Sequence, residues 1–187
     1  MVGPSSILWY DYETYGINFQ TDRIVQFACI RTDLKPSQIE DPEEFYCNIS
    51  DDYLPHPAAC LIHGYTLDDV SDYALSEADF AERVCRILSQ PNTCSAGYNT
   101  ESFDHKFTQH LFFRNLWNPY VWHWDNGNSK WDVIDLVRQT AFLRPGVIKS
   151  KLSENGRSFK LSDIADENNI QIKRNRLRRD QPRPHRA

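Results

Sequence analysis

Two acidic residues, Asp11 and Glu13, are the part of the sequence best suited to chemistry. They lie in the run ILWYDYET at residues 7–14, whose apolar and aromatic residues predict a β-strand. In a strand, residues i and i+2 project from the same face, roughly 6.6–7 Å apart at their Cα atoms. Two carboxylates on one face of a buried strand are costly unless a counter-charge neutralises them, and hard divalent cations such as Mg²⁺ do this well. The alternative is an exposed edge strand with a solvated acidic pair.

A third acidic residue, Asp104, lies in the segment GYNTESFDHKF at residues 97–107. A strand that ends near residue 98 and a helix that starts near residue 102 would put Asp104 in the first helical turn. That is the carboxyl edge of the sheet, where α/β proteins place their sites, so we expect Asp104 to face Asp11 and Glu13. The alternative is that Asp104 only stabilises the helix N-terminus electrostatically.

The rest of the pattern predicts the elements that position these acids. Apolar runs predict strands at residues 7–14, 23–32, 44–49 and 93–98. Apolar periodicity and capping residues predict helices at residues 76–89, 102–116, 132–143 and 158–169. The first three strands are closely spaced, which indicates an antiparallel three-strand meander. The later strand and helices indicate parallel additions, so we expect an α/β domain with a mixed sheet flanked by helices.

Composition excludes several classes of protein. The chain has 187 residues, 40% hydrophobic and 25% charged, which is typical of a globular domain with a core. No run approaches the roughly 20 apolar residues of a membrane-spanning helix, so no membrane partner is expected. The N-terminal residues show no signal peptide. Five cysteines without a C-x-x-C pair indicate neither a zinc site nor a disulfide framework, so we expect reduced thiols in a cytoplasmic protein.

The charge is distributed unevenly along the chain. Residues 171–187 contain seven lysines and arginines and one aspartate, a net charge of +6. The whole chain carries −5, so residues 1–170 carry −11. An acidic body is compatible with a nucleic-acid enzyme, because carboxylates that bind cations contribute to it. The basic tail at 171–187 contains two prolines and no helical pattern, and we expect it to be disordered.

Five segments in order carry a resemblance to a known family. DYET, followed later by G-Y-N-x-x-x-F-D, is similar to motifs one and two of the DEDD superfamily of 3′→5′ exonucleases, whose fold is RNase H-like. The resemblance extends to the bacterial exonuclease I family and runs from about residue 8 to residue 170. Its segments are WYDYETYG, EEFYCNISDDYLPHPAACLIHGYT, GYNTESFDHKF, FFRNLWNPYVWHWDNGNSKWDVIDLVRQTAFLRPGVI and SFKLSDIADENNI.

This resemblance implies a 3′→5′ exodeoxyribonuclease that hydrolyses single-stranded DNA to nucleotide monophosphates. It implies that Asp11, Glu13 and Asp104 hold two Mg²⁺ ions, for which Mn²⁺ could substitute. Two metals roughly 3.5–4 Å apart can clamp a scissile phosphate, one activating the attacking water and the other stabilising the leaving 3′ oxygen. Glu13 is also expected to contact the terminal nucleotide. Expected partners are single-stranded DNA and, in the full-length family, a single-strand DNA-binding protein.

The resemblance also suggests residues that hold the DNA strand. Tyr120, Trp124 and Arg138 match strand-contacting positions, and Lys160 falls where the family usually has an arginine. Lysine keeps the charge of arginine but loses its bidentate fork. Gln109 stands where a strand-contacting arginine is usual, so one phosphate contact is expected to be absent. Aromatic side chains can stack on unpaired bases, at roughly 1–3 kcal/mol each. The alternative for each aromatic residue is a place in the core.

The last motif of the superfamily, H-x-A-x-x-D, is not found. Its histidine is thought to act as general base, and its aspartate is the fourth metal ligand. Here the family pattern gives way near residue 171, and His185 has no aspartate after it. His63, in LIHGYT, resembles a histidine that lies near the terminal nucleotide in proofreading exonucleases, with a structural or surface role as the alternative. It is not a convincing replacement for the missing base.

We therefore expect residues 1–170 to form an exonuclease domain that is incomplete at its C-terminus, from a truncated or frameshifted reading frame. Loss of general-base help typically costs about 10²–10⁴ in rate, so hydrolysis is expected to be very slow or absent. Three alternatives stay open. One is a catalytically dead fragment that only binds single-stranded DNA. Another is that the tail is a basic arm that binds phosphates. The third is an RNA-directed relative such as an oligoribonuclease. The aromatic insert at 117–131 and the SFKL segment argue against the last.

Overall fold

The computed structural model describes residues 4–154 and 156–171 of the chain. The tail expected at 171–187 therefore lies, apart from its first residue, outside the described residues. The chain divides into two compact units, Met1–Asp135 and Leu136–Ala187. The three acidic residues and the large sheet belong to the first unit.

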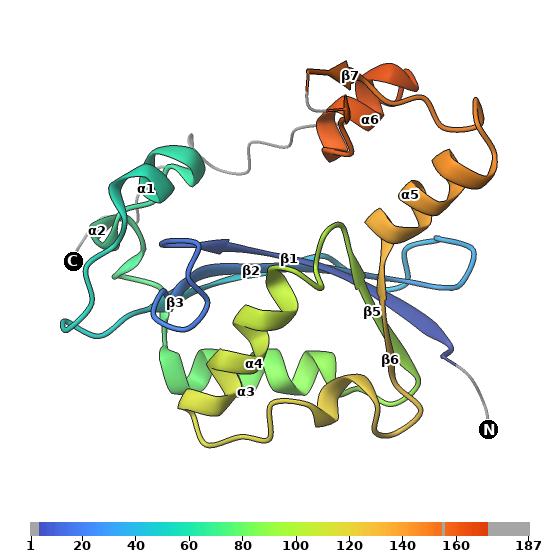
Figure 1. Ribbon diagram of the computed structural model, residues 1–187. Coiled ribbons are helices and arrows are strands. Elements are labelled where there is room, and N and C mark those ends of the chain that lie inside the picture. The colour runs from blue at the N-terminus through green and yellow to red at the C-terminus, as the bar shows by residue number, and fades with distance from the viewer. Residues whose placement is uncertain (1–3, 155, 172–187) are drawn as a thin grey trace. The chain divides into compact units, whose positions relative to one another are not determined.

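A six-stranded mixed sheet forms the centre of the first unit (Figure 1). Its strands are β1 (Ser6–Thr14), β2 (Ile24–Thr32), β3 (Glu43–Asn48), β4 (Leu75–Ser76), β5 (Thr93–Gly97) and β6 (Ser129–Asp132). Their order across the sheet is β4-β3-β2-β1-β5-β6. The pairs β1–β2 and β2–β3 are antiparallel, and β5 and β6 extend the sheet in parallel from β1. The expected α/β architecture, an antiparallel meander with parallel additions, is confirmed.

Helices follow the strands in the first unit. They are α1 (Pro57–His63), α2 (Leu67–Val70), α3 (Glu77–Leu88), α4 (Asp104–Arg114) and the 3-10 helix η1 (Val121–His123). α3 and α4 lie against one face of the sheet (Figure 1). α3 starts where the sequence predicts, because the Ser76 hydroxyl accepts a hydrogen bond from the backbone N–H of Asp79 at 3.2 Å. None of α1, α2, η1, β4 and β6 was predicted from the sequence.

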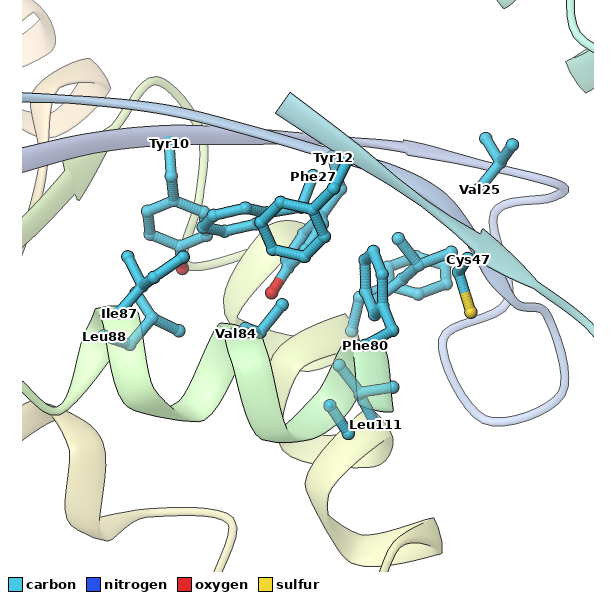
Figure 2. Close-up of a cluster of buried hydrophobic side chains, with 14 of the residues drawn as sticks. Tyr10, Tyr12, Val25, Phe27, Cys47, Phe80, Val84, Ile87, Leu88 and Leu111 are labelled. Carbon is cyan, nitrogen blue, oxygen red and sulfur yellow. The ribbon is translucent and has the colours of Figure 1, made fainter. Parts of the chain in front are cut away.

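The core of the first unit lies between the sheet and α3. Tyr10 and Tyr12 of β1 and Phe27 of β2 are almost fully buried and point towards Val84 and Ile87 of α3 (Figure 2). Aromatic side chains bury roughly 150–250 Å² each, so this layer supplies much of the hydrophobic stabilisation. Because alternate residues of a strand project from opposite faces, the odd-numbered residues of β1 project from the face opposite α3.

A buried arginine ties three elements together at the amino end of β1. The side chain of Arg31 is 4% exposed and lies 3.1 Å from the Glu40 carboxylate. It donates hydrogen bonds to the hydroxyls of Ser6 and Thr93, at 3.0 and 2.8 Å, and to the Ile87 carbonyl at 3.2 Å. Each polar group of this cluster has a partner, so the charge is buried without an orphaned donor. The cluster fixes where β5 begins beside β1.

The second unit is small. The boundary at residue 135 falls inside α5 (Val133–Leu143). α5 confirms the helix expected at residues 132–143. β7 (Leu152–Ser153) and β8 (Gly156–Arg157) form an antiparallel pair, and α6 (Leu161–Glu167) follows. α6 is shorter than the helix expected at 158–169. Among the described residues, no helix has the length and apolar character needed to cross a bilayer. All five cysteines are free thiols, as expected.

Candidate active site

Asp11 and Glu13 occupy alternate positions of β1, on the face opposite its buried tyrosines. Asp11 reaches solvent and Glu13 is partly buried. Desolvation by the surrounding protein nevertheless raises the pKa of the Asp11 carboxyl group. Burial, followed by repulsion from Asp11, raises the pKa of Glu13 to about 7. The expected pair of carboxyl groups on one strand face is therefore present.

Asp104 is the first residue of α4 and is only 3% exposed. Its Oδ1 accepts a hydrogen bond from the backbone N–H of Tyr12 at 3.2 Å. This N–H is available because the pairing of β5 with β1 ends at Trp9 and Ala96. Asp104 thus caps the open edge of β1 at the residue between Asp11 and Glu13. Burial, followed by repulsion from Asp11, raises the pKa of Asp104 to about 8.

Asp11 is the common electrostatic neighbour of the other two acids. It raises the pKa of Glu13 on its own strand and the pKa of Asp104 at the start of α4. The described part of the chain contains no group of three or more His, Cys, Asp or Glu side chains that could hold a metal together. The acids are therefore arranged as two overlapping pairs that share Asp11. Carboxylate oxygens are the hard ligands that Mg²⁺ and Mn²⁺ prefer.

The glycine at the end of β5 lets the chain turn from β5 towards Asp104. A Cβ atom on Gly97 would lie 3.0 Å from the Tyr10 carbonyl oxygen and 2.3 Å from Cγ2 of Thr100. Any larger residue would therefore push β5 away from β1. Two residues later Asn99 adopts a left-handed conformation, φ 67°, which asparagine tolerates better than most residues. This turn delivers α4 to the edge of β1.

Asp132, at the end of β6, is a buried carboxylate that the sequence analysis did not single out. It is 7% exposed. Its Oδ1 accepts hydrogen bonds from the backbone N–H groups of Asn99 at 2.8 Å and Ile134 at 3.1 Å, and its Oδ2 from that of Glu101 at 3.0 Å. An acidic residue between an aromatic residue and a helix, as in KWDVI, is the sequence signal that could have indicated it.

The aromatic residues of segment 117–131 separate into core and surface. Trp122 is 1% exposed, its indole N–H donates to the Pro119 carbonyl at 3.0 Å, and its ring lies 5.3 Å from that of His105. Tyr120 and Trp124, at the two ends of η1, are 54% and 61% exposed. Trp122 therefore anchors η1 beside the first turn of α4 and leaves Tyr120 and Trp124 accessible.

His63 lies at the end of α1, close to the strand that carries the acids. Its Nδ1 accepts a hydrogen bond from the Tyr65 N–H at 3.1 Å, and its ring lies 5.6 Å from the rings of both Tyr15 and Tyr65. It also interacts with the backbone of Thr14, the residue after Glu13, while burial lowers the pKa of its imidazole. His63 therefore has the packing contacts expected of a structural histidine, the alternative that the sequence left open.

The other suggested DNA contacts lie elsewhere in the chain. Arg138 is in α5 and Lys160 immediately precedes α6, and both belong to the second unit. Gln109 is half-buried in α4. The structure therefore brings Asp104 to the strand of Asp11 and Glu13, while the roles of Arg138 and Lys160 stay predictions.

Comparison with known proteins decides the family. A family model described as "Exonuclease" matches residues 8–172, which include all three acids and most of the chain. The chain belongs to this exonuclease family. One relative is an exodeoxyribonuclease I of Buchnera aphidicola from Acyrthosiphon pisum, 46% identical over 166 residues. These residues make up 88% of this chain and 40% of that protein.

Two solved exonuclease structures share the fold. Exonuclease I of Escherichia coli in complex with a dT13 oligonucleotide has a TM-score of 0.84 and 42% identity, over 89% of this chain and 36% of that one. A structure described as an ExoI/SSB-Ct complex has a TM-score of 0.86 and 41% identity, over 90% of this chain and 37% of that one. The chain thus has the RNase H-like fold of these exonucleases and spans a little over a third of their length.

Proposed function

We propose that residues 1–170 form a 3′→5′ exodeoxyribonuclease domain that acts on single-stranded DNA. The observation that carries this proposal is the hydrogen bond from the Tyr12 N–H to Asp104, which joins the acid of α4 to the strand of Asp11 and Glu13. The family match over residues 8–172 supports the same domain bounds.

Asp11, Glu13 and Asp104 would hold two divalent cations, Mg²⁺ or Mn²⁺. Bound cations would polarise the scissile phosphate and activate water. The two overlapping pairs that share Asp11 offer hard oxygen ligands for such cations. Burial and repulsion from Asp11 raise the pKa values of Glu13 and Asp104. Cations bind ionised carboxylates, so metal affinity should rise with pH up to about 8, the pKa of Asp104.

Other residues would hold the DNA strand. Tyr120 and Trp124 are exposed, so both can stack on unpaired bases. Arg138 and Lys160 would contact phosphates, and Glu13 would contact the terminal nucleotide. The dT13 and SSB-Ct complexes of the related enzymes support single-stranded DNA and a single-strand DNA-binding protein as partners. The five free thiols support a cytoplasmic location.

A nuclease assay on the full chain tests this function. A 5′-labelled single strand is incubated with Mg²⁺ or with EDTA, using wild-type protein, Asp11→Ala and Asp33→Asn. Asp33 is a control because its carboxylate also accepts backbone N–H groups, in the loop after β2. This loop follows the residue of β2 that pairs with Ile7 at the start of β1, whereas the acids lie in the second half of β1. Because the late His/Asp motif is not found, we expect slow stepwise shortening from the 3′ end. This shortening should need Mg²⁺ and be lost only in Asp11→Ala.

Two outcomes would contradict the proposal. Substantial Mg²⁺-dependent shortening by Asp11→Ala would refute the role of this acid. Binding of the labelled strand without hydrolysis, by wild type and variant alike, would favour a fragment that only binds single-stranded DNA. The assay therefore separates an enzyme from a binding module.

A further inference from the structure

We infer that Asp132 is a positioning residue of the active site, which holds Asp104 in register with β1 without binding metal or DNA itself. The inference rests on the proposed nuclease function. It assigns a role to a buried acid that lies outside the group Asp11, Glu13 and Asp104.

The contacts of Asp132 are directed at the turn that precedes Asp104. Its two carboxylate oxygens accept the N–H groups of Asn99 and Glu101, at 2.8 and 3.0 Å. Its Oδ1 also accepts the N–H of Ile134, at 3.1 Å, in the first turn of α5. One buried side chain thus joins the end of β6, the start of α5 and the turn between β5 and α4.

The turn held by Asp132 determines where α4 begins. The backbone N–H groups of Phe103 and His105 donate to the Thr100 carbonyl, at 3.2 and 2.8 Å. Thr100 lies between the two residues clamped by Asp132 and is 1% exposed. A shift of Asn99 and Glu101 would therefore move the residues on both sides of Asp104.

Asp104 has little freedom to compensate for such a shift. It is 3% exposed, and its Oδ1 is already bonded to the Tyr12 N–H at 3.2 Å. Neighbours of this kind, which orient metal ligands through hydrogen bonds, typically change metal affinity by about 10–100-fold when they are mutated. Asp132 acts through the backbone of the turn in the same way.

The substitution Asp132→Asn tests the inference with little change in side-chain volume. An amide offers one acceptor oxygen, and its NH₂ group would face a backbone N–H. The control Asp33→Asn makes the same change in a carboxylate whose Oδ1 accepts two backbone N–H groups, those of Lys35 and Ser37 at 2.7 and 2.9 Å. Asp33 follows the end of β2 that pairs with the start of β1.

The readout is Mn²⁺ affinity at pH 7.5, measured by electron paramagnetic resonance on the full chain. We expect Asp132→Asn to weaken Mn²⁺ binding about 10–100-fold, and Asp33→Asn to leave it unchanged. Asp11→Ala and Asp104→Asn are measured alongside. If neither of these changes the affinity, the proposed function itself fails. If both do but Asp132→Asn does not, only the positioning role is overturned.

A second measurement on the wild-type protein covers the case in which Asp132→Asn does not fold. Coupling between two sites is reciprocal, so cation binding should also stabilise the turn. We expect Mg²⁺ to slow amide hydrogen exchange of Asn99 and Glu101 at least several-fold, with no effect at Lys35 and Ser37. Equal exchange rates with Mg²⁺ and with EDTA at Asn99 and Glu101 would overturn the inference.

Discussion

Replacing Asp104 with asparagine should stabilise the metal-free protein while removing its ability to bind cations. The carboxyl group is 3% exposed and close to Asp11, and its pKa is raised from 3.8 to about 8. Between those pH values the folded chain holds a proton that the unfolded chain has lost, so stability falls as pH rises. Asparagine keeps an oxygen that can accept the Tyr12 N–H but has no proton to lose. The variant therefore does not lose folding stability at this position as pH rises.

The size of the effect follows from the pKa values. One pKa unit corresponds to about 1.4 kcal/mol, so a group shifted from 3.8 to about 8 costs roughly 4 kcal/mol of folding free energy by pH 7. Relaxation of the site and entry of water reduce such energies, so we expect about 2–4 kcal/mol. For a chain of this length each kcal/mol moves the melting temperature by about 2–4 °C.

Thermal unfolding with EDTA at pH 4, 6 and 8 measures this prediction. We expect Asp104→Asn and wild type to melt alike near pH 4, and the variant to melt roughly 5–15 °C higher at pH 8. Added Mn²⁺ should raise the melting temperature of wild type and leave that of the variant unchanged. A variant that is less stable than wild type at pH 8, or a difference that does not depend on pH, would refute the electrostatic reasoning.

Two further predictions concern neighbouring parts of the structure. Trp124→Ala should weaken single-stranded DNA binding by about 1–3 kcal/mol in fluorescence anisotropy, with little change in stability to urea. Trp122→Ala should instead lose about 3–5 kcal/mol of stability, because Trp122 is buried. The reverse ranking of the two variants would show that η1 is packed differently. Gly97→Ala should destabilise the fold by about 1–3 kcal/mol in urea unfolding, because its Cβ would lie 2.3 Å from Cγ2 of Thr100; an unchanged midpoint would mean that β5 can shift freely.

Period-two alternation made the first strands and their two acids predictable. In β1 the tyrosines enter the core and the acids face away, as the sequence alone indicates. The place of Asp104 was also predictable, because a strand followed by a helix brings its junction to the carboxyl edge of the sheet. Its bond to Tyr12 could not be foreseen, because it depends on where the pairing of β5 with β1 ends.

The elements that the sequence analysis missed depend on tertiary contacts or on weak local signals. β6 is four residues long and forms because it pairs with β5. α1 begins at Pro57, and proline is common at the first position of a helix. Thr66 and Asp69 form a capping box at α2, a local signal that was overlooked. Spacing alone could not separate buried Trp122 from exposed Trp124, since Trp122 lies within a single helical turn and Trp124 directly follows it.

The alternation in β1 has a consequence for how this chain can change. Under the proposed function, chemistry and stability are carried by adjacent residues of one nine-residue strand. Inserting or deleting a single residue within it would turn the tyrosines outwards and bury the acids, because every side chain downstream changes face. Point substitutions can adjust either property separately, but a one-codon length change near residue 11 would remove both at once. We therefore expect natural variation in the length of this segment to be confined to the loops on either side of it.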